Sequence, residues 1–274
     1  MDAQAAAEQI ADGLLRCDAC GAEFAIEGGI TRLAASEQLH RVADRWPEGT
    51  LTQELFRRNI ESNRRLAEEN SGYARCIEAV AAVEGVIVDV ATGPGSGMCG
   101  ALAPRLREGT YLVLSDASEV LMCGLSECWA TVPHEARIDF WLYDANRFPF
   151  RDGSVDCFTS NLGFSNVRQD RQAGGWGGPA SAYTDAQRCL RPGGLVVDTV
   201  RVYGENSETA ALKREGGSVH ASRDTLEQFW ASIGLRVVEA HTIRSGVGKS
   251  DPADGLPIDE ADEWEDVAYI LRRE

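Results

Sequence analysis

A glycine-rich loop between residues 91 and 100 is the segment whose residue types and spacing point most clearly to chemistry. The stretch VIVDVATGPGSGMCG (86–100) runs from apolar residues through Asp89 into this loop, and its last six letters spell G-x-G-x-x-G. Glycines after a strand let a ligand approach the backbone, and the N-terminus of a following helix suits an anionic group. The pattern is shared by NAD-binding proteins and other nucleotide binders, so alone it indicates only a nucleotide-like ligand.

Three aspartates at the ends of predicted strands narrow this choice. Asp89 lies where it suits a ligand with an ammonium group, and Gly95 follows that strand later than the first glycine of the NAD pattern does. Asp116 ends the next strand and can accept both hydroxyls of a ribose, as in NAD sites too. Asp144 ends the third strand, where it can receive the amine of an adenine. The alternative functions are helix N-caps for Asp116 and Asp144 and tight turns for the glycines.

Strands and helices alternate from residue 84 onward, which predicts βαβ units. We expect strands at 86–90, 110–116, 139–144, 155–161, 194–200, 235–241 and 267–273, and helices near 97–108, 118–130, 180–190 and 222–233. An acidic loop instead of a helix separates the last two strands, so they should pair antiparallel. The predicted fold class is α/β, with a Rossmann-like, mostly parallel seven-stranded sheet and a C-terminal antiparallel hairpin.

Three segments divide the chain by their residue patterns. Residues 1–45 contain a short β-hairpin and helix-like region with a C-x-x-C pair, and residues 46–83 are helical in pattern. Residues 84–274 form the predicted nucleotide-binding domain.

Four stretches resemble the motifs of class I S-adenosylmethionine-dependent methyltransferases, and most closely those of the group that includes the ubiquinone and menaquinone enzymes. They are VIVDVATGPGSG, LSDASEVL, DANRFPFRDGSVD and CLRPGG, in order between residues 84 and 200. Ala91 stands where the family usually has its first glycine. The resemblance implies S-adenosylmethionine as cofactor and methyl transfer as the reaction.

The resemblance also implies roles for individual residues. Around the methionine end of the cofactor it places Asp89, Ala91, Gly93 and Gly95, with Asn161 near the same moiety. Asp116 would bind the ribose with Ala117 against the adenine, and Asp144 and Ala145 would hold the adenine edge. By the same resemblance, the helical segment 46–83 would cover the cofactor as a cap and shape the acceptor site.

The C-x-x-C pair formed by Cys17 and Cys20 resembles the second half of a zinc ribbon, as found on some rRNA guanine methyltransferases. A structural zinc site needs four ligands, and the first half of the ribbon is missing here. We therefore expect a truncated ribbon with free thiols and no zinc. Completion by His40, by Cys76 or by a second chain in a homodimer remains open.

The methyl acceptor and the catalytic residues are less well defined. Residues 161–183 form a long connection in which Phe164, Trp176 and Tyr183 could line an acceptor site, with GGWGG at 174–178 as a mobile lid. A surface loop with one packed tryptophan is the alternative. No histidine lies in a motif that assigns it a role, so the catalytic residue is unknown.

The net charge of −16 disfavours nucleic-acid substrates, because nucleic-acid affinity depends on basic residues. The sequence shows neither a basic export signal nor a long apolar run, so we expect a cytoplasmic protein without a membrane segment. The predicted function is methyl transfer to a small molecule. Alternatives are an RNA methyltransferase of the same fold, a cofactor-binding regulatory protein without turnover and, more distantly, a nicotinamide oxidoreductase.

Overall fold

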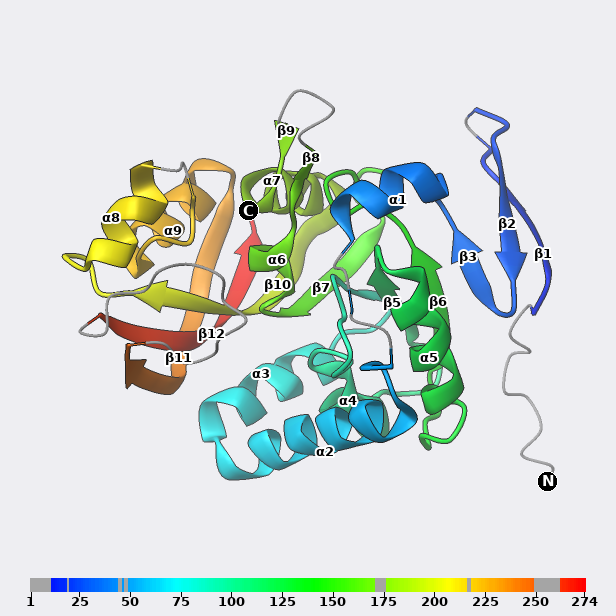
Figure 1. Cartoon of the computed structure of the whole chain (residues 1–274), viewed down its shortest axis with the longest axis horizontal. Coiled ribbons are helices and arrows are strands. Elements are labelled where there is room, and N and C mark those ends of the chain that lie inside the picture. The colour runs from blue at the N-terminus through cyan, green and yellow to red at the C-terminus, as the bar shows by residue number, and fades with distance from the viewer. Residues whose placement is uncertain are drawn as a thin grey trace.

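The computed structural model describes residues 11–18, 20–43, 46, 49–170, 176–215, 218–248 and 262–274. Ten strands form one sheet, in the order β1-β2-β3-β6-β5-β4-β7-β10-β12-β11 (Figure 1). They are β1 (Gly13–Arg16), β2 (Glu23–Glu27), β3 (Ile30–Arg32), β4 (Val86–Asp89), β5 (Tyr111–Asp116), β6 (Arg137–Leu142), β7 (Val155–Asn161), β10 (Leu190–Tyr203), β11 (Leu235–Val247) and β12 (Glu263–Arg273). Two short strands, β8 (Gln169–Asp170) and β9 (Trp176–Gly177), pair separately.

The centre of the sheet is parallel and its two ends are antiparallel. From β3 through β10 every neighbouring pair is parallel, whereas β1 and β2 at one end and β12 and β11 at the other run antiparallel. Strands such as β7 are buried on both faces, as a parallel sheet covered by helices requires. The predicted mostly parallel sheet with a C-terminal antiparallel pair is confirmed.

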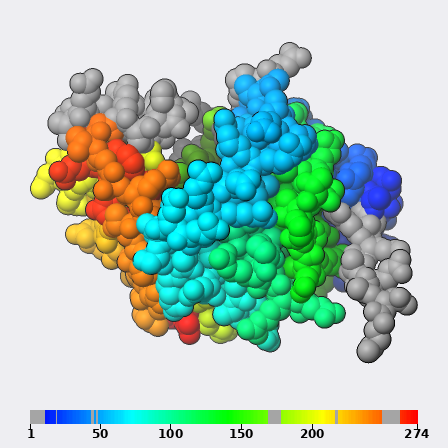
Figure 2. All heavy atoms as spheres, turned by 90° about the horizontal axis from the view of Figure 1, so that it is seen from below, coloured from blue at the N-terminus to red at the C-terminus, as the bar shows by residue number. Residues whose placement is uncertain are grey.

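Helices cover both faces of this sheet. They are α1 (Ser36–Val42), α2 (Gln53–Glu69), α3 (Ser71–Ala81), α4 (Cys99–Leu102) with the 3₁₀ turn η1 (Ala103–Arg105), α5 (Glu119–Trp129), α6 (Gly163–Asn166), α7 (Pro179–Cys189), α8 (Glu208–Glu215) and α9 (Arg223–Ser232). Buried residues of α2 to α5 form the core on one face, and those of α6, α7 and α9 form it on the other. Helices α2 and α3, in cyan, occupy much of the face in Figure 2.

Helices α2 and α3 begin at well-defined caps. The Thr52 hydroxyl accepts a hydrogen bond from the Leu55 N–H, and the Asn70 side chain accepts one from the Tyr73 N–H. Such caps satisfy N–H groups that have no partner inside the helix. The helical pattern predicted for residues 46–83 is therefore present as two helices that meet at Asn70.

The N-terminal hairpin extends the sheet, which has ten strands and not the expected seven. Strand β3 pairs in parallel with β6, with Ile30 opposite Phe140 and Arg32 opposite Leu142. The buried side chain of Ile30 joins the core, and β3 covers the edge that β6 would otherwise expose. The segment that resembles a truncated ribbon is therefore built into the main sheet.

Two other elements differ from expectation. The helix expected over 97–108 is only the short α4 followed by η1, because Pro104 cannot continue an α-helical hydrogen-bond ladder. Helix α8 was not expected from the sequence. No helix in the described part of the chain is long and apolar enough to cross a membrane.

Candidate functional site

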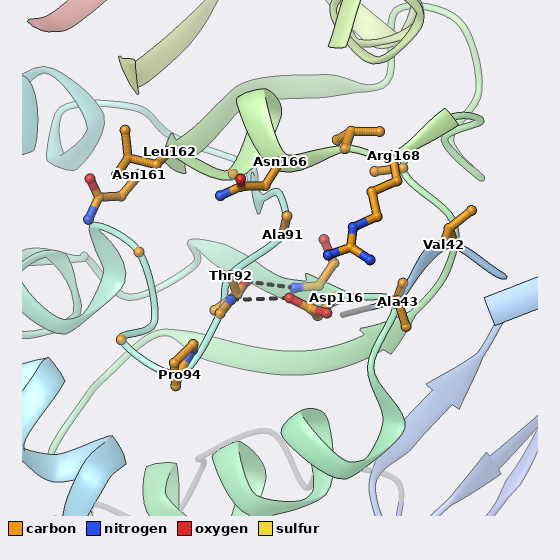
Figure 3. Close-up of a pocket in the computed structure, with 18 of the residues that line it drawn as sticks. Val42, Ala43, Ala91, Thr92, Pro94, Asp116, Asn161, Leu162, Asn166 and Arg168 are labelled. Atoms are coloured by element: carbon orange, nitrogen blue, oxygen red, sulfur yellow. Dashed lines mark hydrogen bonds between the residues drawn. The ribbon is translucent and has the colours of Figure 1, made fainter. Parts of the chain in front are cut away.

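A cavity of about 500 Å³ lies at the carboxyl ends of the central strands (Figure 3). From β4 the sheet continues through β5 and β6 on one side and through β7 and β10 on the other, so the order of the strands reverses direction at β4. Ligands of open α/β sheets bind at such a point. Most lining residues lie where four strands end: 91–95 and 97 at β4, 115–117 at β5, 143–146 at β6, and 161–163 at β7. The others are residues 166–168 and the N-terminal positions Val42, Ala43, Trp46, Asn59 and Asn63.

Unusual backbone conformations gather at this cavity. Among the described non-glycine residues, positive φ angles occur at Ala91 (48°), Ser96 (57°) and Leu162 (64°). Ala91 and Leu162 line the cavity, and Ser96 belongs to the glycine loop. Non-glycine residues with a left-handed backbone are strained, and such residues are common at functional sites. The left-handed backbone of Ala91 also explains why a glycine would suit that position.

The glycine loop is held from outside by helix α2. The Asn63 Nδ2 donates to the carbonyl oxygens of Gly95 and Gly97, at 2.9 and 2.8 Å. The Arg64 Nε donates to the carbonyl oxygen of Gly100 at 2.8 Å. The loop is therefore fixed by a helix that precedes it in the chain by about thirty residues.

Asp116 joins the glycine loop to the start of α5. Its Oδ2 accepts from the Gly93 N–H at 3.2 Å and its Oδ1 accepts from the Ser118 N–H at 2.9 Å. The residue lines the cavity together with Ala117. A carboxylate oxygen can accept a second hydrogen bond, so Asp116 can serve as a loop anchor and also accept ligand hydroxyls.

Asp144 is 3% exposed and lines the cavity beside Ala145. Its Oδ1 accepts from the backbone N–H of Asn146 at 2.9 Å and from the Asn146 Nδ2 at 2.7 Å. Its Oδ2 accepts from the Gln38 Nε2 at 3.2 Å. Both oxygens of this carboxylate are thus oriented by neighbouring amides.

Asp89 lies behind the loop and does not line the cavity. It is fully buried, and its Oδ1 accepts from the Thr159 hydroxyl at 2.7 Å. A Cβ on Gly97 would lie 2.7 Å from its Oδ2, so the carboxylate packs directly beneath the loop backbone. Burial raises the pKa of Asp89 to about 7. Asp89 was expected to contact the ammonium group of a ligand directly. In the structure its carboxylate instead packs against the glycine loop from the side away from the cavity.

The other residues expected at the cofactor all border the cavity. They are Ala91, Gly93, Gly95, Ala117, Ala145 and Asn161. The Asn161 Oδ1 is buried and has no hydrogen-bond partner among the described residues, although its side chain belongs to the cavity wall. An unsatisfied buried acceptor next to a cavity is suited to a ligand donor.

The expected acceptor wall is not formed by Phe164 and Tyr183. Both side chains are fully buried in the core, where their rings stack with centroids 4.3 Å apart. The Tyr183 hydroxyl donates to the Asp198 Oδ2 at 2.5 Å and lies 3.2 Å from the His220 Nε2. Trp176 belongs to β9, but its side chain lies outside the described part of the structure.

The buried group around Tyr183 is uncharged near neutral pH. Burial raises the pKa of Asp198 to about 8 and lowers the pKa of His220 to about 3. His220 and Asp198 are absent from the cavity lining. The geometry therefore assigns neither residue as a catalytic base.

Several lining residues were not anticipated from the sequence. Arg168 extends its side chain into the cavity (Figure 3), and its backbone carbonyl accepts from the Asn146 Nδ2 at 2.8 Å. Val42, Ala43, Trp46 and Asn59 come from N-terminal segments that carry no binding motif. The expected helical cap over residues 46–83 was the one sequence feature that predicted a contribution of this part of the chain to the site.

The C-x-x-C pair forms a tight turn between β1 and β2. The Cys17 N–H donates to the Ala22 carbonyl and the Gly21 N–H donates to the Cys17 carbonyl, both at 2.8 Å. Neither Cys17 nor Cys20 forms a disulfide bond in the described part of the chain. No group of three or more histidine, cysteine or acidic side chains within the described ranges is placed to hold a metal ion.

Comparisons with known proteins agree with this geometry. A family profile described as "Methyltransferase domain" matches residues 88–198. A chloroplastic methyltransferase of Arabidopsis thaliana, described as uncharacterized, is 25% identical over 177 residues, which are 59% of this chain and 45% of the relative. The chain thus spans less than half the length of that relative.

Solved structures share the fold at low sequence identity. A candidate methyltransferase of Bacillus halodurans C-125 has a TM-score of 0.53 and 17% identity, with 72% of this chain and 96% of the other covered. Geranyl diphosphate C-methyltransferase of Streptomyces coelicolor A3(2), with geranyl-S-thiolodiphosphate and S-adenosyl-L-homocysteine, scores 0.52 at 14% identity over 74% and 76%. The [4+2]-cyclase SpnF scores 0.52 at 16% identity over 75% and 84%, so the fold alone does not determine the reaction. Over residues 88–198 the chain is therefore similar to a methyltransferase domain, and it shares the fold of solved methyltransferases.

Proposed function

We propose that the protein transfers the methyl group of S-adenosylmethionine to a small-molecule acceptor. One observation carries the proposal: the glycine loop, Asp116 and Asp144 border a single cavity at the carboxyl ends of adjacent strands. The two carboxylates match the adenosine part of a ligand, and the backbone of the glycine loop matches the remainder of that ligand.

The lining residues fit the parts of the cofactor in order. Asp116 would accept the ribose hydroxyls, and Asp144 would accept the adenine amine with Ala117 and Ala145 against the ring. Gly93, Gly95 and Asn161 would face the methionine moiety. When bound, the cofactor supplies an activated methyl group on a sulfonium, so the chain mainly has to align the acceptor and exclude water.

The charges around the cavity favour a small acceptor over RNA. Arg168 is the one cationic side chain among the described lining residues, which also include the carboxylates Asp116 and Asp144. On α2, Arg57 pairs with Glu54 at 3.5 Å and Arg64 binds a backbone carbonyl. The cavity lining itself therefore lacks the concentrated positive charge that RNA binding requires. The geranyl diphosphate C-methyltransferase of similar fold is named for a small substrate.

Finer assignments extend this proposal. We place the chain in the group that includes the ubiquinone and menaquinone methyltransferases, on the four motifs, and in the cytoplasm. We divide it into the segments 1–45, 46–83 and 84–274, although the first two segments supply parts of the same cavity wall. Cys17 and Cys20 remain predicted free thiols.

Turnover with labelled cofactor tests the proposal. The protein would be incubated with S-adenosylmethionine labelled on the methyl group, together with small-molecule extracts or with purified ribosomal and transfer RNA. We expect label in the small-molecule fraction only. Asp116→Ala should abolish most of it, because lost hydrogen bonds at this half-buried carboxylate weaken cofactor binding by about 1–3 kcal/mol.

The exposed Glu135→Ala change is the matched control and should keep full activity. Label in RNA would replace the small-molecule assignment with the RNA alternative. Binding of the cofactor without transfer to any fraction would favour a regulatory role.

A further inference from the structure

Two carboxamide side chains from the N-terminal segments hydrogen-bond groups at opposite ends of the cavity. Gln38 of α1 donates to Asp144, and Asn63 of α2 donates to the glycine loop. Both residues lie outside residues 88–198, which the methyltransferase profile matches. Neither belongs to a motif that the sequence analysis identified.

At the first end, the N-terminal hairpin fixes the position of α1. Strand β3 pairs with β6, the Leu33 N–H continues this pairing by donating to the Leu142 carbonyl at 2.9 Å, and Arg32 forms an ion pair with Glu119 of α5 at 2.7 Å. Leu39 and Val42 of α1 are buried. Helix α1 is therefore attached to the same strand, β6, that leads into Asp144.

This attachment gives Gln38 a defined task. Asn146 supplies two donors to the Asp144 Oδ1, and Gln38 supplies the donor to Oδ2. A carboxylate held in this way keeps a lone pair of Oδ2 in a fixed direction. That oxygen can accept from the amine of adenine, but it would repel the carbonyl oxygen that hypoxanthine carries at the same position.

At the second end, Asn63 uses both hydrogens of its amide on the loop. It bridges the carbonyl oxygens of Gly95 and Gly97, on either side of Ser96 with its left-handed backbone. A Cβ on Gly95 would lie 3.2 Å from the Asn63 Nδ2, so the helix and the loop are closely packed. The amide thus stabilises a strained turn that faces the cavity.

We propose that Gln38 and Asn63 are positioning residues that divide cofactor recognition between them. Gln38 aligns Asp144 and sets the preference for adenine, whereas Asn63 sets the shape of the loop that receives the amino-acid part. The inference rests on the proposed function. Val42 and Ala43, which follow Gln38 along the chain, lie at one side of the cavity, and Pro94 of the glycine loop lies at the other (Figure 3).

Three ligands distinguish the two ends in a binding experiment. S-adenosylhomocysteine has both parts, methylthioadenosine lacks the amino-acid part, and S-inosylhomocysteine carries hypoxanthine in place of adenine. Calorimetry would compare the wild type with Gln38→Met and Asn63→Leu, which remove the donors at similar volume. His40→Gln on α1 and Glu61→Gln on α2 are exposed controls.

We expect a different ligand dependence for each variant. Asn63→Leu should weaken S-adenosylhomocysteine about tenfold and methylthioadenosine less than about threefold, since only the former contacts the loop. Gln38→Met should weaken both about fivefold and reduce the preference for adenine over hypoxanthine by a similar factor. The controls should match the wild type with all three ligands.

The outcomes separate the inference from the proposed function. If the wild type binds none of the three ligands, the proposed function fails. If the wild type binds but both variants weaken all ligands equally, or weaken none, the division of roles is wrong. The smaller changes Gln38→Asn and Asn63→Ala, which add no charge, must reproduce the same ligand dependence, which guards against variants that fold poorly.

Discussion

The loop after β4 and the segment after β7 start from neighbouring strands but contribute to the cavity in different ways. After β4, backbone of the glycine loop forms the wall, and side chains from outside hold it. After β7, Asn161, Leu162 and Gly163 line the cavity, yet the first aromatic residue, Phe164, points into the core. Both segments contain a left-handed non-glycine residue, Ala91 or Leu162.

The difference shows which kind of sequence signal reports a site. Glycines and strand-ending aspartates report backbone geometry, and that geometry determined where the cavity lies. An aromatic residue indicates an apolar surface, but its type does not show whether the side chain points toward the cavity or into the core. Phe164 and Tyr183 were expected at an acceptor wall because of their type, but the same property makes them good core residues.

Replacement of Phe164 by alanine should produce the largest effect on stability. We expect the free energy of unfolding to fall by about 3–5 kcal/mol, because a fully buried ring stacked on Tyr183 is removed. Cofactor affinity of the folded protein should change little. Chemical denaturation measures the first quantity, with the exposed Val120→Ala as control. An unchanged stability with a weakened acceptor KM would return Phe164 to the acceptor site.

The close approach of the two segments predicts the next largest effect. A Cβ on Gly163 would overlap the carbonyl oxygen of Val90 and lie 3.0 Å from that of Ala91. Gly163→Ala should therefore lower the free energy of unfolding by about 3 kcal/mol. Gly153→Ala is the control, because its nearest neighbour is 4.0 Å away and only its φ of 64° causes strain, worth about 1 kcal/mol. Equal effects of the two changes would mean that the segments do not touch as described.

A smaller, pH-dependent effect on stability tests the buried group formed by Tyr183, Asp198 and His220. The pKa of Asp198 is about 8 in the folded protein and 3.8 ordinarily, so its contribution to stability is lost as pH rises through 8. Asp89 acts in the same sense, up to its pKa of about 7. The pKa of His220 falls from 6.5 to about 3, so His220 acts in the opposite sense below pH 6.5.

Because two aspartates act against one histidine, stability should fall from about pH 4 onward, and it should keep falling between pH 6.5 and 8, where His220 no longer compensates. Asp198→Asn should remove about 1–2 kcal/mol of this decline, measured by denaturation across the range. Asn keeps an acceptor for the Tyr183 hydroxyl, so the fold should persist. A variant whose pH profile parallels the wild type would show that Asp198 is ionised in the core.

Much of the central fold could be predicted, because each βα unit carries its own local signals. The apolar runs around Val88 and Phe158 and the turns after Asp89 and Asp116 mark strand ends within a few residues. The N-terminal hairpin could not be placed in this way. Its pairing with β6 depends on a contact between Ile30 and Phe140, which are far apart in the sequence.

The site shows the same division between local and distant signals. Asp116, Asp144, Gly93 and Gly95 follow directly from motif spacing, and all four border the cavity. Asp89 was expected there too, but it points beneath the loop, a direction that strand-end position does not determine. Gln38, Asn63 and Arg168 were missed because they reach the site only through tertiary packing.

Calorimetric titration with S-adenosylhomocysteine and, separately, with NADH tests the central claim most directly. We predict micromolar or tighter binding of S-adenosylhomocysteine to one site per chain and no heat with NADH, because Asp116 and Asp144 border a cavity matched to a single adenosine. Heat with NADH and none with S-adenosylhomocysteine would contradict the assignment of the cavity.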